Sequence, residues 1–165
     1  MKIVKKLIFV RHGIAEDQAF EITDFERSLT PKGKTISKRM ARQLLEKEST
    51  LGVILTSTAF RALETAYIFA GEFGIIPENV IANSNLYNKM NVNYLTELIS
   101  ITAINSEIVT LFGHNPAFTE MADILCKQGC DFIPKSGVVC LSFNIKNWGE
   151  LKHHTGHMEY FLKPK

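Results

Sequence analysis

The sequence predicts a three-layer α/β fold, in which helices cover both faces of a mostly parallel sheet and an antiparallel hairpin ends the chain. Three observations lead to this prediction. Short apolar segments alternate with amphipathic helical segments along most of the chain, as in proteins built from βα units. The apolar segments contain few polar residues, which is typical of strands buried on both faces. The last two strand-like segments flank a short turn, which indicates an antiparallel pair.

The first two elements are a strand and an amphipathic helix. The predicted strand, Leu7–Val10, is wholly apolar and ends at Arg11. A polar stretch over residues 14–29 follows it without clear periodicity. Thr30 and Pro31 then supply the N-cap and the first position of a helix. The apolar residues of that helix recur every four residues on one face, at Ile36, Met40 and Leu44.

The remaining elements alternate in the same way. Val53–Thr56 is a second apolar strand, and Ser57 is the expected N-cap of a helix that runs to Phe73 and stops at Gly74. Next we expect a weak strand over 77–82, a helix over 91–104 and a strand over 108–112. Asn115 then caps and Pro116 starts a helix that ends near Cys126. The chain is expected to end in a hairpin with strands over 138–143 and 151–155.

Composition excludes several classes of protein. The 165 residues show no repeat, low-complexity segment or linker, so we expect one domain over residues 1–165. Lys and Arg number 19 against 17 Asp and Glu, and a net charge of +2 argues against a strongly basic nucleic-acid binder. No stretch approaches the roughly 18 apolar residues of a membrane span. The apolar run after the basic start Met1–Lys6 is too short for a signal peptide.

The cysteines point to a reducing compartment. An odd count without framework spacing is not typical of a disulfide-stapled secreted domain. Cys126 and Cys130 lie four residues apart, but no second pair of metal ligands follows at a zinc-like distance, so ordinary thiols are the better interpretation. We therefore expect a cytoplasmic protein.

Charged and imidazole side chains follow three of the predicted strands. The first strand runs into Arg11 and His12, the second into the helix turn that carries Arg61, and the fourth into His114. Because ligands bind outside the carboxyl ends of strands in such sheets, these four side chains are expected to meet at one edge. Arginine forks match phosphate oxygens, and the helix N-termini after Ser57 and Asn115 add N–H groups. The sequence therefore predicts a site for a phosphoryl group.

The chemistry at this site needs a nucleophile from the protein. No phosphate-binding loop of the Gly-x4-Gly-Lys-Ser/Thr type and no Asp-rich metal motif is present. A neutral imidazole attacks phosphorus and leaves well afterwards, so His12 fits this role. Neighbouring arginines favour its neutral form. Glu64, three residues after Arg61, is a weaker candidate for orienting that arginine.

Each of these residues also has an ordinary interpretation when taken alone. His114 can be a loop histidine that caps or packs, and Arg61 a solvated helix residue. The joint pattern of all of them directly after apolar strands favours the functional interpretation. The remaining histidines near the C-terminus resemble a metal site, but an exposed edge strand explains them better, because adjacent residues in a strand point to opposite faces; they are His153, His154 and His157.

The motifs resemble the histidine phosphatase superfamily, in the phosphoglycerate-mutase-like branch that carries an Arg-His-Gly motif. The match runs through nearly the whole chain, and the length looks most like the short phosphohistidine phosphatases of the SixA type. No single motif is specific, but together they are. The matching segments are Leu7–Gly13, Arg27–Gly33, Thr56–Thr65, Leu86-Tyr87, Val109–Pro116 and Lys135–Gly137.

The resemblance implies a phosphoglycerate-mutase-like fold and a role for each matching residue. His12 would be the nucleophile that becomes phosphorylated. Arg11, Arg61 and His114 would bind the phosphoryl oxygens and stabilise charge in the transition state. The reaction would be two displacements, from the substrate to His12 and then to water. The resemblance implies neither a metal nor an organic cofactor.

The substrate expectation depends on a missing acid. Larger relatives supply a carboxylic acid from an inserted segment, and this chain has no obvious equivalent, although Asp17, Asp24 and Glu97 are candidates. Phosphohistidine loses imidazole, a better leaving group than an alkoxide, so general-acid help worth about 10²–10⁴-fold matters less. The SixA-type relatives share this lack. We therefore expect phosphohistidine on a protein as the substrate.

Two alternatives stay open. The first alternative to a protein phosphohistidine phosphatase is a small-molecule phosphomonoesterase with a broad pocket. The second is a non-catalytic module that binds phosphoproteins. The second fits less well, since a binding module does not need the nucleophile. We expect a monomer that binds neither nucleic acid nor membranes. Three aromatic residues either line the mouth of the pocket or serve the core or the surface, namely Tyr87, Phe118 and Phe20.

Overall fold

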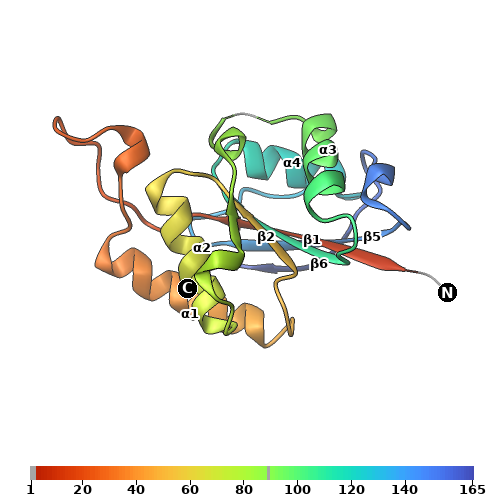
Figure 1. Ribbon diagram of the computed structural model, residues 1–165, viewed down its shortest axis with the longest axis horizontal. Helices are drawn as coiled ribbons and strands as arrows, with labels where there is room; N and C mark the ends of the chain where they lie inside the picture. The colour runs from red at the N-terminus through yellow and green to blue at the C-terminus, as the bar shows by residue number, and fades with distance from the viewer. Residues whose placement is uncertain (1–2, 89) are drawn as a thin grey trace.

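The computed structural model describes residues 3–88 and 90–165; Met1 and Lys2 of the expected basic start, and Lys89, lie outside the described residues. The described residues build a six-stranded sheet in the order β3-β2-β4-β1-β5-β6 (Figure 1). Strands β3, β2, β4 and β1 are parallel, and β5 and β6 add antiparallel neighbours. The predicted fold class is confirmed. The strands are β1 Val4–Arg11, β2 Val53–Thr56, β3 Val80–Ala82, β4 Ile108–Gly113, β5 Val138–Asn144 and β6 His157–Leu162.

Helices cover both faces of this sheet. Alternate side chains of β1 point to opposite faces, so Ile8 and Val10 join one apolar cluster while Leu7 and Phe9 join another. The first cluster contains buried residues of α1 and α2, and the second contains those of α3 and α4. This burial on both faces explains why the strand is wholly apolar. The helices are α1 Pro31–Leu45, α2 Phe60–Glu72, α3 Val92–Thr102 and α4 Ala117–Leu125, and the 3₁₀ turns are η1 Asp24–Glu26, η2 Pro77–Asn79, η3 Ser84–Tyr87 and η4 Trp148–Glu150.

The start of α1 follows from local sequence. Thr30 Oγ1 accepts the Gly33 N–H at 2.9 Å, and Pro31 takes the first helical position, as predicted. Gly33 itself is needed for packing, because a Cβ there would lie 2.1 Å from the carbonyl oxygen of Ile14. The same carbonyl accepts the Thr30 N–H at 2.9 Å, so the helix start is tied to the chain that leaves β1.

Several predicted boundaries shift. Helix α2 begins at Phe60 rather than directly after Ser57, because Ser57 and the next two residues form the connection from β2. The third strand is limited to Val80–Ala82, since Pro77–Asn79 forms a 3₁₀ turn. Strand β1 begins earlier, at Val4, because Val4, Lys5 and Lys6 already pair with β5.

The hairpin at the C-terminus is present, but the expected second strand over 151–155 is wrong. The strand that pairs with β5 is β6, and the connection before it turns back along the end of α4. The His154 N–H donates to the Ile124 carbonyl and the Gly156 N–H to the Leu125 carbonyl, at 2.8 and 2.7 Å. His154 has a φ of 57° and belongs to a turn. These backbone hydrogen bonds go to a helix end, so they are not available for a strand pair.

Two further features bear on the sequence expectations. Among the described residues, no helix combines the length and the apolar character that a membrane span requires. All three cysteines are free thiols; Cys126 and Cys140 are buried and Cys130 is half-buried.

Phe118 and Phe20 give a test of the core. Phe118 is fully buried and packs edge-on against Phe9 at 5.3 Å between ring centroids, whereas Phe20 is fully exposed. Phe118→Ala is expected to lower the free energy of unfolding by about 3–5 kcal/mol, because lost burial and the remaining cavity add. Phe20→Ala is the matched control and should change it by less than about 0.5 kcal/mol. Urea denaturation measures both, and equal losses would contradict this placement of Phe118.

Candidate active site

The loops after β1, β2 and β4 leave the sheet at the same edge. Arg11, the last residue of β1, lies opposite Gly113, the last residue of β4. The next N–H groups continue this pairing, since the His12 N–H donates to the Gly113 carbonyl at 3.0 Å and the Ser57 N–H to the Phe112 carbonyl at 2.9 Å. Parallel pairing therefore brings the three carboxyl ends together, as expected for a ligand site in an open α/β sheet.

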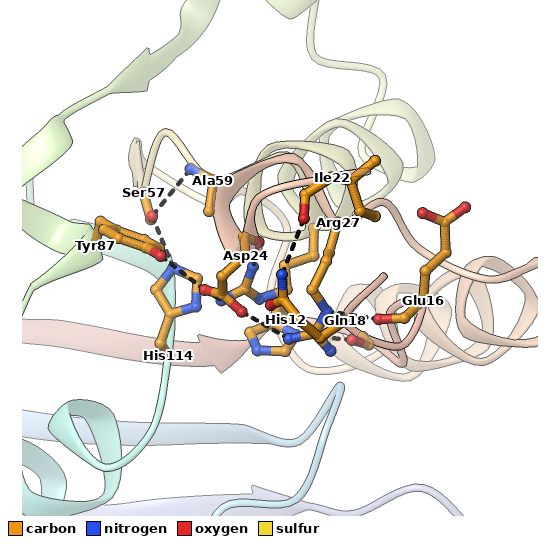
Figure 2. A network of polar contacts seen from close by, with 12 residues as sticks. His12, Glu16, Gln18, Ile22, Asp24, Arg27, Ser57, Ala59, Tyr87 and His114 are labelled. Atoms are coloured by element: carbon orange, nitrogen blue, oxygen red, sulfur yellow. Dashed lines mark hydrogen bonds and ion pairs between the residues drawn. The ribbon is translucent and has the colours of Figure 1, made fainter. Parts of the chain in front are cut away.

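The four residues singled out from the sequence gather at this edge. The rings of His12 and His114 lie 5.1 Å apart, between centroids, and both are buried (Figure 2). The Arg61 side chain is also buried, while Arg11 is half-buried. Both guanidinium groups lie close enough to contribute to lowering the pKa of His12.

His12 is held as a neutral ring of one tautomer. Its Nδ1 lies 2.8 Å from the Gly13 carbonyl oxygen, and because that oxygen only accepts, Nδ1 carries the hydrogen. The lone pair of the neutral ring is then on Nε2. Burial, with smaller contributions from His114, Arg61 and Arg11, lowers the pKa of His12 to about 3.

The backbone around His12 is fixed from two sides. The Gly13 N–H donates to Thr65 Oγ1 at 3.0 Å, so α2 holds the residue after the ring. On the other side the Ser136 N–H donates to the Arg11 and His12 carbonyls, each at 3.1 Å. Ser136 adopts a φ of 62°, and its buried hydroxyl lies 2.8 Å from Ser37 Oγ. Ser136 therefore helps to fix the backbone at Arg11 and His12. Its place in the motif Lys135–Gly137 does not by itself indicate this role.

His114 is oriented by the loop after β2. Its Nε2 lies 2.7 Å from Ser57 Oγ, and the same Oγ accepts the Ala59 N–H at 3.2 Å (Figure 2). The rings of Tyr87 and His114 pack perpendicular to each other, with 5.4 Å between centroids. Burial and then the Arg61 charge lower the pKa of His114 to about 4. The sequence predicts Ser57 as the N-cap of the helix, and it gives no signal for the contact between Ser57 and His114.

Three nitrogens at the site have no hydrogen-bond partner among the described residues. Within residues 3–88 and 90–165, four buried side-chain nitrogen or oxygen atoms lack a hydrogen-bond partner, and three belong to this site: Arg11 Nε, Arg61 Nε and His114 Nδ1. Buried polar groups are rarely left unpaired, because desolvation costs about 1–3 kcal/mol each. Two are guanidinium donors, which match the oxygens of an anion. Their chemistry therefore suits a phosphoryl group.

Asp24 reaches the site from the segment after β1. Its Oδ2 accepts from Arg61 NH2 at 2.9 Å and from the Tyr87 hydroxyl at 2.7 Å, and its Oδ1 accepts from Arg27 NH1 at 2.8 Å (Figure 2). Hydrogen bonds from Tyr87, Arg27 and Arg61 hold the pKa of this carboxyl well below its usual range. Of the three candidate acids, Asp24 therefore lies at the site but as a carboxylate without a proton to donate. Asp17, beyond the strand end, and Glu97, on α3, are exposed.

The expectation that Glu64 orients Arg61 is corrected. Asp24 pairs with Arg61, whereas Glu64 Oε2 accepts the Leu29 N–H at 3.2 Å. Glu64 thus holds the end of the segment that carries Asp24. Arg27 joins the site through Asp24, so a third arginine lies near it. The motif quoted for the resemblance contained Arg27, but residues 14–29 show no periodicity from which its position could be inferred.

The described residues contain no group of three or more His, Cys, Asp or Glu side chains able to hold a metal ion. The edge strand expected for the three C-terminal histidines is wrong for His153 and His154 and holds for His157. His153 and His154 pack ring against ring at 6.3 Å in a turn, and His157 is exposed at the start of β6.

The burial of His12 predicts an unusual pH response. With a pKa of about 3, its ring NMR signals should not titrate between about pH 5 and pH 8. The unfolded chain binds this proton near pH 6.5, so the free energy of unfolding should fall as pH drops from 6.5 towards 3. His12→Gln should lose the His12 part of this pH dependence. A ring signal that titrates near the ordinary value of 6.5 would contradict the burial.

Comparison with known proteins gives one related sequence and many related folds. No protein-family model matches the chain. The sequence is 35% identical over 121 residues to an uncharacterized protein of Picosynechococcus sp.. The aligned region covers 73% of this chain and 72% of that protein. This identity and coverage show common membership of one family.

The solved structures agree on the fold. A SixA from Agrobacterium tumefaciens has a TM-score of 0.79 at 23% identity, over 97% of this chain and 98% of that one. A protein histidine phosphatase SixA in complex with tungstate has a TM-score of 0.79 at 20% identity, over 96% and 97%. A mycobacterial glucosyl-3-phosphoglycerate phosphatase has a TM-score of 0.70 at 13% identity, over 94% and 97%. The chain therefore belongs to the family of the Picosynechococcus protein, and its fold is the phosphoglycerate-mutase-like fold of the SixA structures.

Proposed function

We propose that this protein is a phosphatase that transfers a phosphoryl group to His12 and then to water, and that its substrate is phosphohistidine on a protein. One observation carries the proposal. The neutral, buried ring of His12 directs its hydrogen to Gly13, beside three buried nitrogens that lack partners. This arrangement joins a nucleophile with groups suited to an anion.

In the first half-reaction the Nε2 lone pair of His12 attacks phosphorus, and the bond from phosphorus to the substrate nitrogen breaks. The His12 ring becomes a phosphoimidazolium cation, because Nδ1 keeps its hydrogen. The Gly13 carbonyl, 2.8 Å from Nδ1, stabilises that charge. A substrate ring protonated on its other nitrogen leaves as neutral imidazole, so this step needs no proton from the enzyme.

In the second half-reaction water attacks the phosphorus of phospho-His12. The bond from phosphorus to Nε2 breaks, and His12 leaves as the same neutral tautomer with which the cycle began. The proton that water loses goes to the released phosphate or to solvent. Because Nδ1 is held by Gly13 throughout, the ring needs no change of tautomer between the two steps.

The cationic groups stabilise the phosphoryl oxygens. The Nε atoms of Arg11 and Arg61 are donors without partners. Ser57 Oγ already accepts the Ala59 N–H, so its own hydrogen is available for His114 Nε2. A neutral His114 that accepts at Nε2 carries its hydrogen on Nδ1, which becomes a third donor. These donors act where charge develops in the transition state, in surroundings with little water.

The leaving group favours phosphohistidine over alkyl phosphates. An alkoxide needs a proton from a general acid, and the carboxyl group at the site, Asp24, is held ionised. Imidazole does not have this requirement. Two of the similar structures are SixA proteins, which agrees with this substrate. The similar mycobacterial phosphatase is named for a sugar phosphoglycerate, so a small phosphate ester is the alternative.

The nucleophile is tested by trapping the phosphoenzyme. The wild type is expected to gain one phosphoryl group on mixing with substrate, seen by intact mass at neutral pH, since phosphohistidine is labile in acid. His12→Ala should show no such adduct and lose at least about 10³-fold in kcat/KM. Equal phosphorylation of both proteins would contradict the proposed nucleophile.

The substrate class is tested by comparing leaving groups. We expect turnover of a phosphohistidine protein to exceed that of alkyl phosphates by at least about 10²-fold in kcat/KM, the contribution of a missing general acid. Aryl phosphates, with better leaving groups than alkyl phosphates, should fall between them. Faster hydrolysis of alkyl phosphates would favour the small-molecule alternative. Anion binding without turnover of any of them would favour a binding module.

A further inference from the structure

Residues 14–29 form an arm that extends away from the sheet, the orange-red segment at the upper left of Figure 1. We infer that Asp24 of this arm is a positioning residue, which holds Arg61 so that its Nε remains for the phosphoryl group. The inference rests on the proposed function, since it assigns Arg61 to phosphoryl binding. It makes the arm a part of the catalytic site and not only a connection between β1 and α1.

Asp24 occupies the two terminal nitrogens of Arg61 and leaves the third. Arg61 NH2 donates to Asp24 Oδ2 at 2.9 Å, and Arg61 NH1 donates to the Asp24 carbonyl oxygen at 2.6 Å. Arg61 Nε is buried and has no partner. A guanidinium group is planar, so two fixed donors determine the direction of its other N–H groups, including the one on Nε. The Asp24 contacts therefore set where Arg61 Nε points.

The same carboxylate reaches the other side of the site. The Tyr87 hydroxyl donates to Asp24 Oδ2 at 2.7 Å, and the Tyr87 and His114 rings pack perpendicular to each other at 5.4 Å between centroids. Asp24 thus links Arg61 with Tyr87, which lies between Asp24 and His114 in these contacts. Figure 2 shows Asp24, Tyr87 and His114 together. This link joins two of the groups assigned to the phosphoryl oxygens.

The arm is itself anchored on both sides of Asp24. Arg27 donates to Asp24 Oδ1 at 2.8 Å through NH1 and to the Glu16 carbonyl at 2.6 Å through Nε. The Glu16 N–H donates to the Ser28 carbonyl at 2.8 Å, and Ala15 pairs with Leu29. The Asp24 side chain is still 43% exposed, so it is not a core residue whose loss would empty the interior.

Two other roles for Asp24 make different predictions. As a general acid, it would matter for alkyl leaving groups and little for phosphohistidine. As a competitor that occupies Arg61 in place of phosphate, its removal would strengthen anion binding and raise activity. Simple charge repulsion predicts the same strengthening, since a negative charge close to an anion site is removed. Positioning predicts the opposite sign, because a misdirected donor weakens binding.

The experiment measures tungstate affinity and kcat/KM in Asp24→Ala and Asp24→Asn. Asp24→Ala should weaken tungstate binding by about 10-fold and lower kcat/KM by about 10–100-fold, equally for phosphohistidine and aryl phosphate. Asp24→Asn keeps an oxygen in the same place and should retain more of both. Tyr87→Phe, which removes only the second donor to Oδ2, should give a smaller loss of the same sign.

The matched control is Glu21→Gln. Glu21 is exposed on the same arm and carries the same charge, so its neutralisation should leave tungstate affinity and kcat/KM unchanged. Stronger tungstate binding in both Asp24 variants, or a loss confined to aryl and alkyl phosphates, would overturn the positioning role. The tungstate measurement does not depend on turnover, so it decides the role of Asp24 even if His12 proves not to be the nucleophile.

Discussion

The parallel pairing of β1, β2 and β4 is the constraint on which the rest of this structure depends. Arg11 lies opposite Gly113, and Thr56 opposite Phe112, so the three strands end level with one another. Parallel strands buried on both faces are held in register by the packing of their apolar side chains, since a slip of one residue would move every side chain of a strand to the opposite face of the sheet. The core thus sets the positions from which the loops with His12, Arg61 and His114 begin.

The site combines positive charge with neutral histidines, and burial explains how both can coexist. Removing an imidazole from water disfavours its charged form, and nearby guanidinium groups act in the same direction. Arginine keeps its charge under the same conditions, because its pKa is far higher. Burial and electrostatics therefore divide the roles between residue types, with the histidines left as nucleophile or donor and the arginines left as fixed charges.

The Asp24 carboxylate, on the exposed arm, takes a role that fits this division between neutral histidines and charged arginines. Asp24 lies between Arg61, Arg27 and the Tyr87 hydroxyl, and these partners keep it ionised. An ionised carboxylate cannot protonate a leaving group, but it can hold a guanidinium in one direction. The net charge of +2 for the whole chain hides this local arrangement of two arginines around one aspartate.

The alternation of strands and helices can be predicted from the sequence alone, and with it the edge where Arg11, His12, Arg61 and His114 meet. Those features follow from apolar periodicity and from capping residues such as Thr30, which act over a few positions. The pairing of Asp24 with Arg61, 37 residues away, and with Tyr87, 63 residues away, is visible only in the folded chain. The same holds for residues 151–155, which turn along the end of α4 instead of forming a strand. Such contacts depend on how distant polar groups satisfy one another after the core has formed, and no local pattern in the sequence records that.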